Sequence, residues 1–176
     1  RVACGIAQGM GLALGVPVVA VGSHLAVADT IGRVPTPQLV AVAMDARMAE
    51  VYVTVVMLAG QASTEARSAS DAGHPQTPRW DAPAPCVLIG PVLMAAADLS
   101  TWLAQGFDGW MAESPGIAQA WLAGDAWAAY GADLAWPSGW TAHAARSPSV
   151  AAVARQGALA WRAGEGQDPA DVRPLY

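Results

Sequence analysis

The sequence contains no lysine, so all nine of its cationic side chains are arginines. A P-loop needs a lysine that reaches the nucleotide phosphates, and this kind of phosphate site is therefore excluded. Catalysis through a lysine Schiff base is excluded for the same reason. The three histidines, His24, His74 and His143, are spaced too far apart to form a metal-binding pair within one helix. The G-x-S-x-G pattern of serine hydrolases is also absent.

Charged residues are scarce and mostly acidic. They make up 13% of the chain, and 14 acidic residues against nine arginines give a net charge of −5 and an isoelectric point near 4.9. Proteins that bind nucleic acid on their own usually present a basic surface. The charge balance therefore argues against a free-standing nucleic-acid-binding protein.

Apolar residues are abundant. They make up 54% of the chain, alanine alone fills 40 positions, and the mean hydropathy is +0.32. A chain this apolar has enough material for a buried core, unlike a disordered protein. The two cysteines, Cys4 and Cys86, form no disulfide framework and have no zinc-ligand spacing. We expect them to be buried thiols in a reducing compartment, which points to the cytoplasm.

An uncharged stretch runs from Val2 to Ala28. Its internal order argues against a membrane span, because Gly15 and Pro17 end a helix predicted over residues 2–14. A β-branched run at 17–21 then predicts a strand that is buried on both faces. Ser23 is a suitable cap for a second helix at 24–31. We therefore predict a helix–strand–helix unit and no membrane contact.

The remainder of the chain reads as a second α/β unit. Two valine-rich strands at 39–44 and 50–58 flank a hairpin connection, and residues 61–85 read as a long loop. Further strands are predicted at 86–93 and 120–124, and helices at 98–105, 125–130 and 149–162. In the last helix, the mostly apolar positions 150, 153, 154, 157 and 161 share one stripe.

Two glycines in the first helix lie on one helical face. Gly5 and Gly9 are four residues apart, and each interior glycine costs roughly 0.5–1 kcal/mol relative to alanine. Such a cost suggests a packing role, because small residues let another backbone approach closely. The approaching backbone belongs either to the chain's own sheet or to a helix of a partner.

The predicted hairpin carries the densest cluster of charge in an apolar region. Asp45 and Glu50 flank the turn, and Arg47 lies at its tip. One interpretation is a solvated turn in which an aspartate side chain caps local amides. The alternative is that these side chains face a cleft between two lobes.

Several segments resemble the TsaB/YeaZ family. Residues 1–9, 12–17 and 21–23 are similar to the segment that follows that family's glycine-rich turn. Residues 44–52, which contain Asp45, Arg47, Glu50 and Tyr52, resemble its D-A-R-M-x-E-V-Y signature, and residues 171–176 resemble its closing segment. The late turn that contains Gly124, Asp125 and Trp127, with Tyr130 beyond it, is similar to the family's G-[ND]-x-W turn.

The resemblance implies an actin-like (ASKHA, ribonuclease H-like) fold of two α/β lobes. Residues 1–34 would be the remainder of the first lobe, and residues 38–176 would form the second. The family's opening strands and first helix would precede Arg1, so the first lobe is expected to be incomplete.

The resemblance also implies a function. The family is the non-catalytic partner in making N6-threonylcarbamoyladenosine in tRNA, so we expect no catalytic residue, metal or cofactor in this chain. The expected partners are a TsaD-type catalytic subunit and a TsaE-type ATPase, with a homodimer as a further possibility and only indirect contact with tRNA. The predicted partner interface is one helix face formed by Val2, Gly5, Ile6, Gly9 and Leu12.

Two other functions are compatible with the sequence. One is an enzyme of the same fold, either a glycoprotease-type peptidase or an ATP-using enzyme, although the motifs of these classes are missing. The other is an alanine-rich cytoplasmic α/β domain whose function is unrelated to the family.

Overall fold

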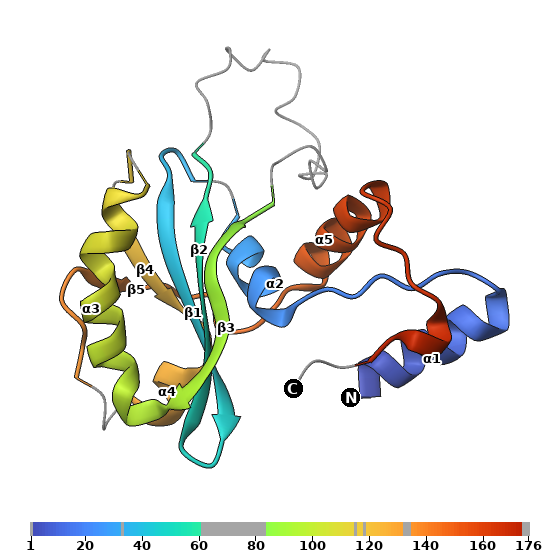
Figure 1. The fold of residues 1–176 in the computed structure, drawn as a ribbon, viewed down its shortest axis with the longest axis horizontal. Coiled ribbons are helices and arrows are strands. Elements are labelled where there is room, and N and C mark those ends of the chain that lie inside the picture. The colour runs from blue at the N-terminus through green and yellow to red at the C-terminus, as the bar shows by residue number, and fades with distance from the viewer. Residues whose placement is uncertain are drawn as a thin grey trace.

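The computed structural model describes residues 2–32, 34–60, 84–114, 116–117, 119–131 and 135–173. Its centre is a five-stranded sheet in the order β3-β2-β1-β4-β5 (Figure 1). The strands are β1 (Gln38–Arg47), β2 (Glu50–Leu58), β3 (Cys86–Ala95), β4 (Gln119–Ala123) and β5 (Trp140–Ala142). β1, β2 and β3 pair antiparallel, whereas β4 and β5 extend the sheet in parallel with β1.

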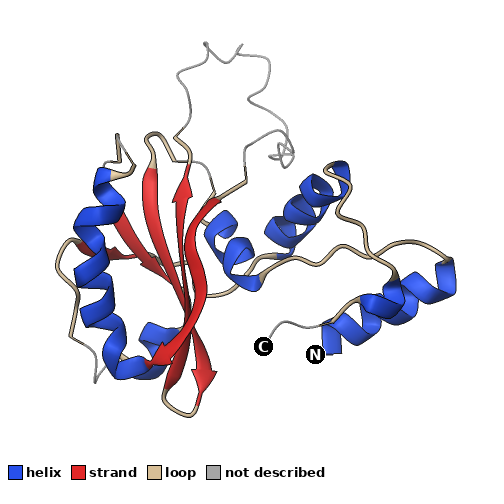
Figure 2. Ribbon diagram, in the orientation of Figure 1, coloured by secondary structure: helices blue, strands red, loops and turns tan. Residues whose placement is uncertain are grey.

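Helices cover both faces of the sheet (Figure 2). On one face lie α3 (Leu99–Ala112) and α4 (Ala126–Tyr130), and on the other lies α2 (Ser23–Thr30), against which α5 (Val150–Arg162) packs. The remaining helix, α1 (Val2–Leu14), lies beyond α5, where the 3₁₀ turn η3 (Pro169–Asp171) packs against it. Among the described residues, no helix has both the length and the apolar character needed to cross a membrane.

The central strand β1 explains why the sheet needs two layers of helices. Successive side chains of a strand point to opposite faces, so an unbroken apolar run buries both. Leu39, Ala41 and Ala43 pack in a core with α3, whereas Val40 and Val42 pack in a second core with α2. All five are completely buried.

Most predicted elements of the second α/β unit are confirmed, including the hairpin, β3, β4 and α5. Helix α3 is longer than the predicted 98–105, because the chain continues as helix through Gly106 and Gly109. At Gly106 the ring of Trp110 occupies the space that a side chain would fill, so packing there compensates for the weak helix propensity of glycine. The three-residue strand β5 was not predicted.

The predicted strand at 17–21 is wrong. Val18 forms an isolated antiparallel bridge with Gln167, with the two N–H···O distances at 3.0 and 2.9 Å. No residue of this run belongs to the sheet, and none is fully buried. A β-branched run becomes a strand only where a neighbouring strand pairs along its length, and here a single residue pairs.

Helix α5 places its apolar stripe outward. Val150 is 87% exposed, Val153 40% and Trp161 55%, whereas Ala152 and Gln156 are buried. Polar contacts hold the inner side of α5 against α2. Arg155 forms an ion pair with Asp29, and the Ser149 N–H donates to the Thr30 hydroxyl at 2.9 Å.

The cysteines also differ from expectation. Cys86 is exposed and Cys4 is half-buried, and both are free thiols. Cys86 begins β3, which lies at the edge of the sheet that the described strands form.

The predicted division at residue 34 separates α2 from the sheet that α2 covers, since Val27 and Ala28 share a core with β1 and β2. The two-lobe division stays a prediction. Arg33, most of the predicted loop at 61–85 and the final residues 174–176 lie outside the described part of the chain.

Candidate functional site

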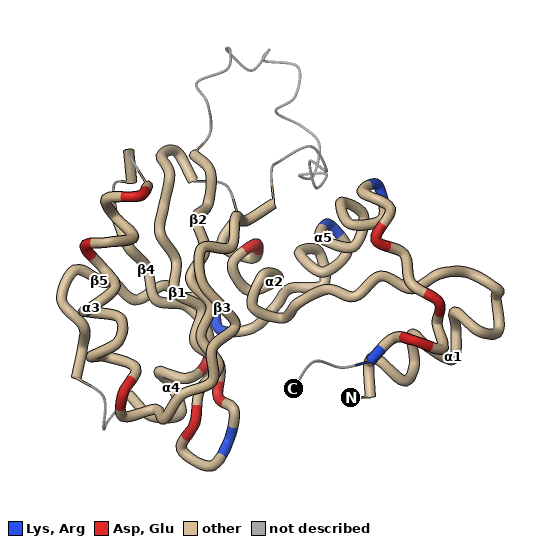
Figure 3. Tube along the Cα trace, in the orientation of Figure 1, with Lys and Arg blue, Asp and Glu red and all other residues tan. Residues whose placement is uncertain are grey.

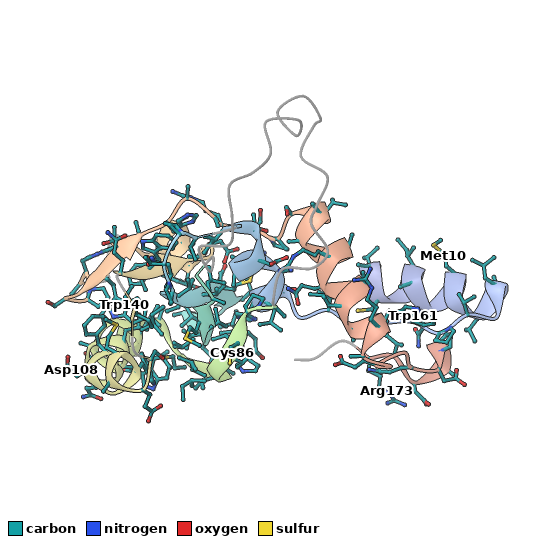
Figure 4. The ribbon with its side chains drawn as sticks, turned by 90° about the horizontal axis from the view of Figure 1, so that it is seen from above. Met10, Cys86, Asp108, Trp140, Trp161 and Arg173 are labelled. Atoms are coloured by element: carbon teal, nitrogen blue, oxygen red, sulfur yellow. The ribbon has the colours of Figure 1, made fainter. Side chains whose placement is uncertain are left out.

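The five residues predicted to form a partner interface all lie on the exposed side of α1. Val2 is 78% exposed, Ile6 58% and Leu12 61%, and both glycines are exposed. Met10, on the same helix, is also 58% exposed and is labelled in Figure 4. The sequence left open whether Gly5 and Gly9 pack on the chain's own sheet. Among the described residues, no neighbouring atom lies within 4 Å of a Cβ placed at either glycine, so that explanation fails.

The opposite side of α1 attaches the helix to the body. Gly11 is its one buried residue, and a Cβ there would lie 2.7 Å from Val18 Cγ2 and 2.8 Å from Pro169 Cγ. The Gln8 side-chain amide donates a hydrogen bond to the Val172 carbonyl at 3.1 Å. These contacts fix which side of α1 faces outward, and that outward side is apolar and carries no charge.

The second candidate region is the β1–β2 hairpin. Its last strand pair is Arg47 and Glu50, which leaves Met48 and Ala49 as a two-residue loop, and the register shifts between Asp45 and Arg47. Arg47, Met48 and Ala49 have φ angles of 72°, 55° and 60°. The left-handed conformation costs a residue with a Cβ about 1–2 kcal/mol, so this turn needs support from its surroundings.

Asp45 supplies much of that support. Its Oδ1 atom accepts a hydrogen bond from the Arg47 N–H at 2.7 Å and another from the Tyr130 hydroxyl at 2.6 Å. The Asp45 N–H in turn donates to Asp125 Oδ1 at 2.9 Å. The family-like hairpin and the family-like late turn, which are about 80 residues apart in sequence, therefore meet in one network.

The network shifts the pKa values of its members. The Tyr130 hydroxyl, followed by the Arg47 N–H, holds the pKa of Asp45 below its ordinary value. The same hydrogen bond raises the pKa of Tyr130, because losing the phenol proton would bring two anions together. The Asp45–Tyr130 pair is therefore a carboxylate with a protonated phenol at neutral pH.

The late turn is positioned by close packing of backbones. Gly124 has a φ of 97°, and a Cβ there would collide with the Ala43 carbonyl of β1. Its N–H donates to the Ala145 carbonyl at 2.8 Å. Trp127 packs against Trp136 with ring centroids 4.9 Å apart. Only glycine allows α4 to begin this close to β1, which brings Asp125 within reach of Asp45.

His24 joins α2 to the same end of the sheet. Its Nε2 lies 3.2 Å from the Tyr52 carbonyl, and the two rings meet edge to face. Burial lowers the pKa of His24, whereas the Tyr52 carbonyl and the nearby Asp125 charge act in the opposite direction. No sequence signal pairs these residues, because the contact depends on how α2 crosses the sheet.

The two regions are separate in space. Figure 1 places α1 on the far side of α5, whereas the hairpin projects from one end of the sheet beside α4. Within the described part of the chain, no group of three or more histidine, cysteine, aspartate or glutamate residues is arranged to hold a metal ion. The hairpin network is thus a set of hydrogen bonds that supports a turn, and the α1 face is an apolar surface.

Comparison with known proteins identifies the fold. No family model matches the sequence, and no curated protein matches it either. Among solved structures, YeaZ from Pseudomonas aeruginosa matches with a TM-score of 0.66 and 22% sequence identity, over 100% of this chain and 67% of that chain. An uncharacterized protein from the same organism, described as similar to the peptidase YeaZ, matches with a TM-score of 0.65 and 22% identity, over 100% of this chain and 66% of that one.

The chain thus spans about two thirds of the length of both structures. The resemblance to the TsaB/YeaZ family is confirmed at the level of the fold, and so is the expected mixed α/β architecture.

Proposed function

We propose that this chain is a TsaB/YeaZ-type scaffold subunit of the complex that makes N6-threonylcarbamoyladenosine in tRNA, and that it binds a TsaD-type catalytic subunit through the outward face of α1. The observation that best supports this function is the chemical character of that face. It is apolar, uncharged and exposed, and two of its positions are glycines with open space in front of them. The YeaZ fold and the family-like motifs support the choice of partner.

The composition of the face suits a helix from another protein. Gly5 and Gly9 lie one helical turn apart with open space in front of each, so a second helix can lie close to the α1 backbone. Val2, Ile6 and Leu12 are exposed on the same side of the helix, and full burial of such a side chain contributes about 1.5–3 kcal/mol. Burial of these three side chains against a partner helix would therefore supply an apolar contribution to the interface.

The same face is suited to self-association. A helix without charged residues meets its own copy without like-charge repulsion, and a two-fold interface requires such self-complementarity. We therefore propose that the chain pairs with itself when the catalytic subunit is absent, and that the catalytic subunit competes for this face.

Other parts of the proposal follow from the resemblance. A TsaE-type ATPase joins the assembly, the chain itself holds no cofactor, and the site of action is the cytoplasm. The chain has a net charge of −5 and therefore attracts the negatively charged tRNA poorly. We therefore assign direct tRNA contacts to the partners.

The interface is tested by placing a side chain at each of the two glycines. We expect Gly5→Leu and Gly9→Leu each to weaken binding of a purified TsaD-type subunit at least tenfold, because a branched side chain keeps the two backbones apart. Isothermal titration calorimetry measures the dissociation constant. The matched control is Gly109→Leu, since Gly109 is also an exposed helical glycine with open space around it but lies on α3.

We expect the variants to stay folded, because leucine stabilises an exposed helical position by up to about 1 kcal/mol relative to glycine. Unchanged affinity in both folded variants would refute the interface on α1. Failure of the unaltered chain to bind the catalytic subunit would refute the scaffold function. Hydrolysis of a peptide or of ATP by the purified chain, abolished by Asp45→Ala, would instead support the enzyme alternative.

A further inference from the structure

His143 directly follows β5, and its ring accepts a hydrogen bond. The His143 backbone N–H donates to the Leu122 carbonyl at 2.8 Å, which continues the pairing of β5 with β4 by one residue. The ring atom Nδ1 lies 3.1 Å from the Ala145 nitrogen, and it is the acceptor because a backbone amide can only donate. The half-buried ring lies beside the indole of Trp121, with the ring centroids 5.1 Å apart.

Only a neutral imidazole makes the bond to Ala145. In a neutral ring one nitrogen carries the proton and the other accepts, whereas both nitrogens of the charged ring are donors. Protonation of His143 Nδ1 would set its N–H against the Ala145 N–H, so this bond would be lost. His24 differs, because its Nε2 faces the Tyr52 carbonyl, which can only accept, and the charged form keeps that bond.

The surroundings of His143 compensate a positive charge poorly. The adjacent strands β4 and β5 carry no charged residue (Figure 3). Burial lowers the pKa of His143, and no charged side chain among the described residues contributes to this shift. The Trp121 ring attracts a cation and opposes burial in part. Arg146, three positions along the chain, is exposed and has the same sign as a protonated ring.

The partner of His143 also holds the late turn. The Ala145 carbonyl accepts a hydrogen bond from the Gly124 N–H at 2.8 Å, at the start of that turn. Asp125, the next residue, accepts the Asp45 N–H of the hairpin. Ala145 therefore donates to the histidine ring with its amide and binds the late turn with its carbonyl, so the two contacts share one residue.

We propose that His143 is a pH-sensitive switch that holds the late turn while its ring is neutral and releases the turn when its ring is protonated. The neutral ring fixes the Ala145 amide, and Ala145 in turn fixes the Gly124 amide. Loss of the first bond lets Ala145 move, which weakens the second. Asp125 then loses its defined position beside Asp45, so the charge on one imidazole is coupled to the hairpin network.

The switch acts on the acid side of neutrality. When residues 143–145 detach, His143 regains its ordinary pKa of 6.5, whereas its pKa in the attached form is lower. The detached form then binds more protons, and each pH unit below 6.5 favours it by up to about tenfold. The stabilisation by His143 is thus complete above pH 6.5 and is lost as the pH falls toward the pKa of the attached form.

Nitrogen-15 NMR of the full chain tests the hydrogen bond itself. At pH 7.5 we expect Nδ1 of His143 to be unprotonated and Nε2 to carry the proton, and we expect a His143 pKa below 6.5. A proton on Nδ1 at pH 7.5, or a pKa of 6.5 or higher, would overturn the proposal.

Hydrogen exchange tests the coupling to the late turn. We expect the protection factors of the Ala145 and Gly124 amides, corrected for the intrinsic effect of pH on exchange, to fall at least fivefold between pH 7.5 and 5.0. Asp45 stays ionised over this range, because its pKa lies below its ordinary value. Constant protection at Ala145 would refute the switch. A fall at Ala145 without one at Gly124 would refute its connection to the late turn.

His143→Asn is the matched substitution. The Oδ1 atom of asparagine accepts a hydrogen bond from the N–H two residues further on, as in an Asx-turn, and it does not titrate. We expect protection at Ala145 and Gly124 to change less than twofold between pH 7.5 and 5.0 in this variant. His143→Ala should have low protection at both pH values. A fall in His143→Asn as large as in the unaltered chain would assign the effect to another group, such as His24, and would overturn the proposal.

Discussion

Asp45 joins three segments of the chain. Its carboxylate holds the Arg47 amide in the hairpin and the Tyr130 hydroxyl at the end of α4, and its own amide binds Asp125 at the start of that helix. The carboxylate is the acceptor in two of these bonds, and both favour its ionised form. One ionised side chain thus couples the shape of the turn to the position of α4.

At this scale we predict the effect of removing one hydroxyl. Tyr130→Phe should raise the pKa of Asp45 toward its ordinary value, because the largest cause of its depression is lost. A carboxyl whose pKa is lowered by folding stabilises the protein above its unfolded pKa and loses that contribution as the pH falls through its folded pKa. The variant should therefore show a smaller loss of stability on acidification between about pH 5 and 2.

Carboxyl-detected NMR titration measures the pKa, and denaturation at several pH values measures the stability. Tyr52→Phe is the control, because His24 contacts the backbone carbonyl and the ring of Tyr52, and phenylalanine keeps both. An Asp45 pKa that is the same in Tyr130→Phe and in the unaltered chain would contradict the network.

Among the elements, α5 has an unusual orientation. Amphipathic helices normally turn their apolar stripe to the core. Here the stripe with Val150 and Trp161 faces outward, and Ser149 and Arg155 make polar contacts with α2. Directional polar contacts therefore help to hold α5 against α2, and those of Ser149 lie at the start of the helix.

We predict that Ser149→Ala lowers the free energy of unfolding by about 1–2 kcal/mol. The substitution removes the side-chain acceptor of the Ala152 N–H, at 3.1 Å, and a hydrogen-bond partner of the Thr30 hydroxyl. Urea denaturation followed by circular dichroism measures the change. Ser149→Thr keeps the hydroxyl and should retain most of the stability, so an equal loss in both variants would point to packing instead of capping.

For the whole molecule, the proposed self-association has a direct consequence. Ile6→Glu places a carboxylate on the α1 face, and in a symmetric pair two such charges enter one interface. We expect the dissociation constant of the dimer to rise at least tenfold, measured by sedimentation equilibrium. Leu93→Glu is the control, because Leu93 is similarly apolar and 46% exposed but lies on β3. Equal effects of both variants would show that general surface charge, not the α1 face, governs association.

The sequence predicts the elements of the sheet well where the signal is local. The valine-rich runs of β1 and β2 and the charged turn between them identify the hairpin, because a strand and a tight turn depend on neighbouring residues. The three residues of β5 carry too short a pattern to be recognised. The run at 17–21 has the composition of a strand, but no neighbouring strand pairs along its length. Amino-acid composition alone does not show whether such a strand is present.

Long-range relations are not visible in the pattern. The spacing of Gly5 and Gly9 locates a face on α1, but only the structure shows that this face is open. Likewise, the apolar stripe of α5 is evident from periodicity, whereas its direction depends on the Asp29–Arg155 and Thr30–Ser149 pairs, whose members are more than 100 residues apart. The meeting of Asp45, Asp125 and Tyr130 depends on the same kind of distant contact.

The bridge between Val18 and Gln167 makes the attachment of α1 measurable. These two residues exchange both of their backbone hydrogen bonds, one just after α1 and the other just after α5. Detachment of α1 and its adjoining segment from the body breaks these two hydrogen bonds. The rate of deuterium uptake at the two amides therefore reports how often α1 detaches. A protein that binds α1 and stabilises the attachment of this helix to the body would slow deuterium uptake at the Gln167 amide. Gln167 lies on the other side of the helix from the bound face.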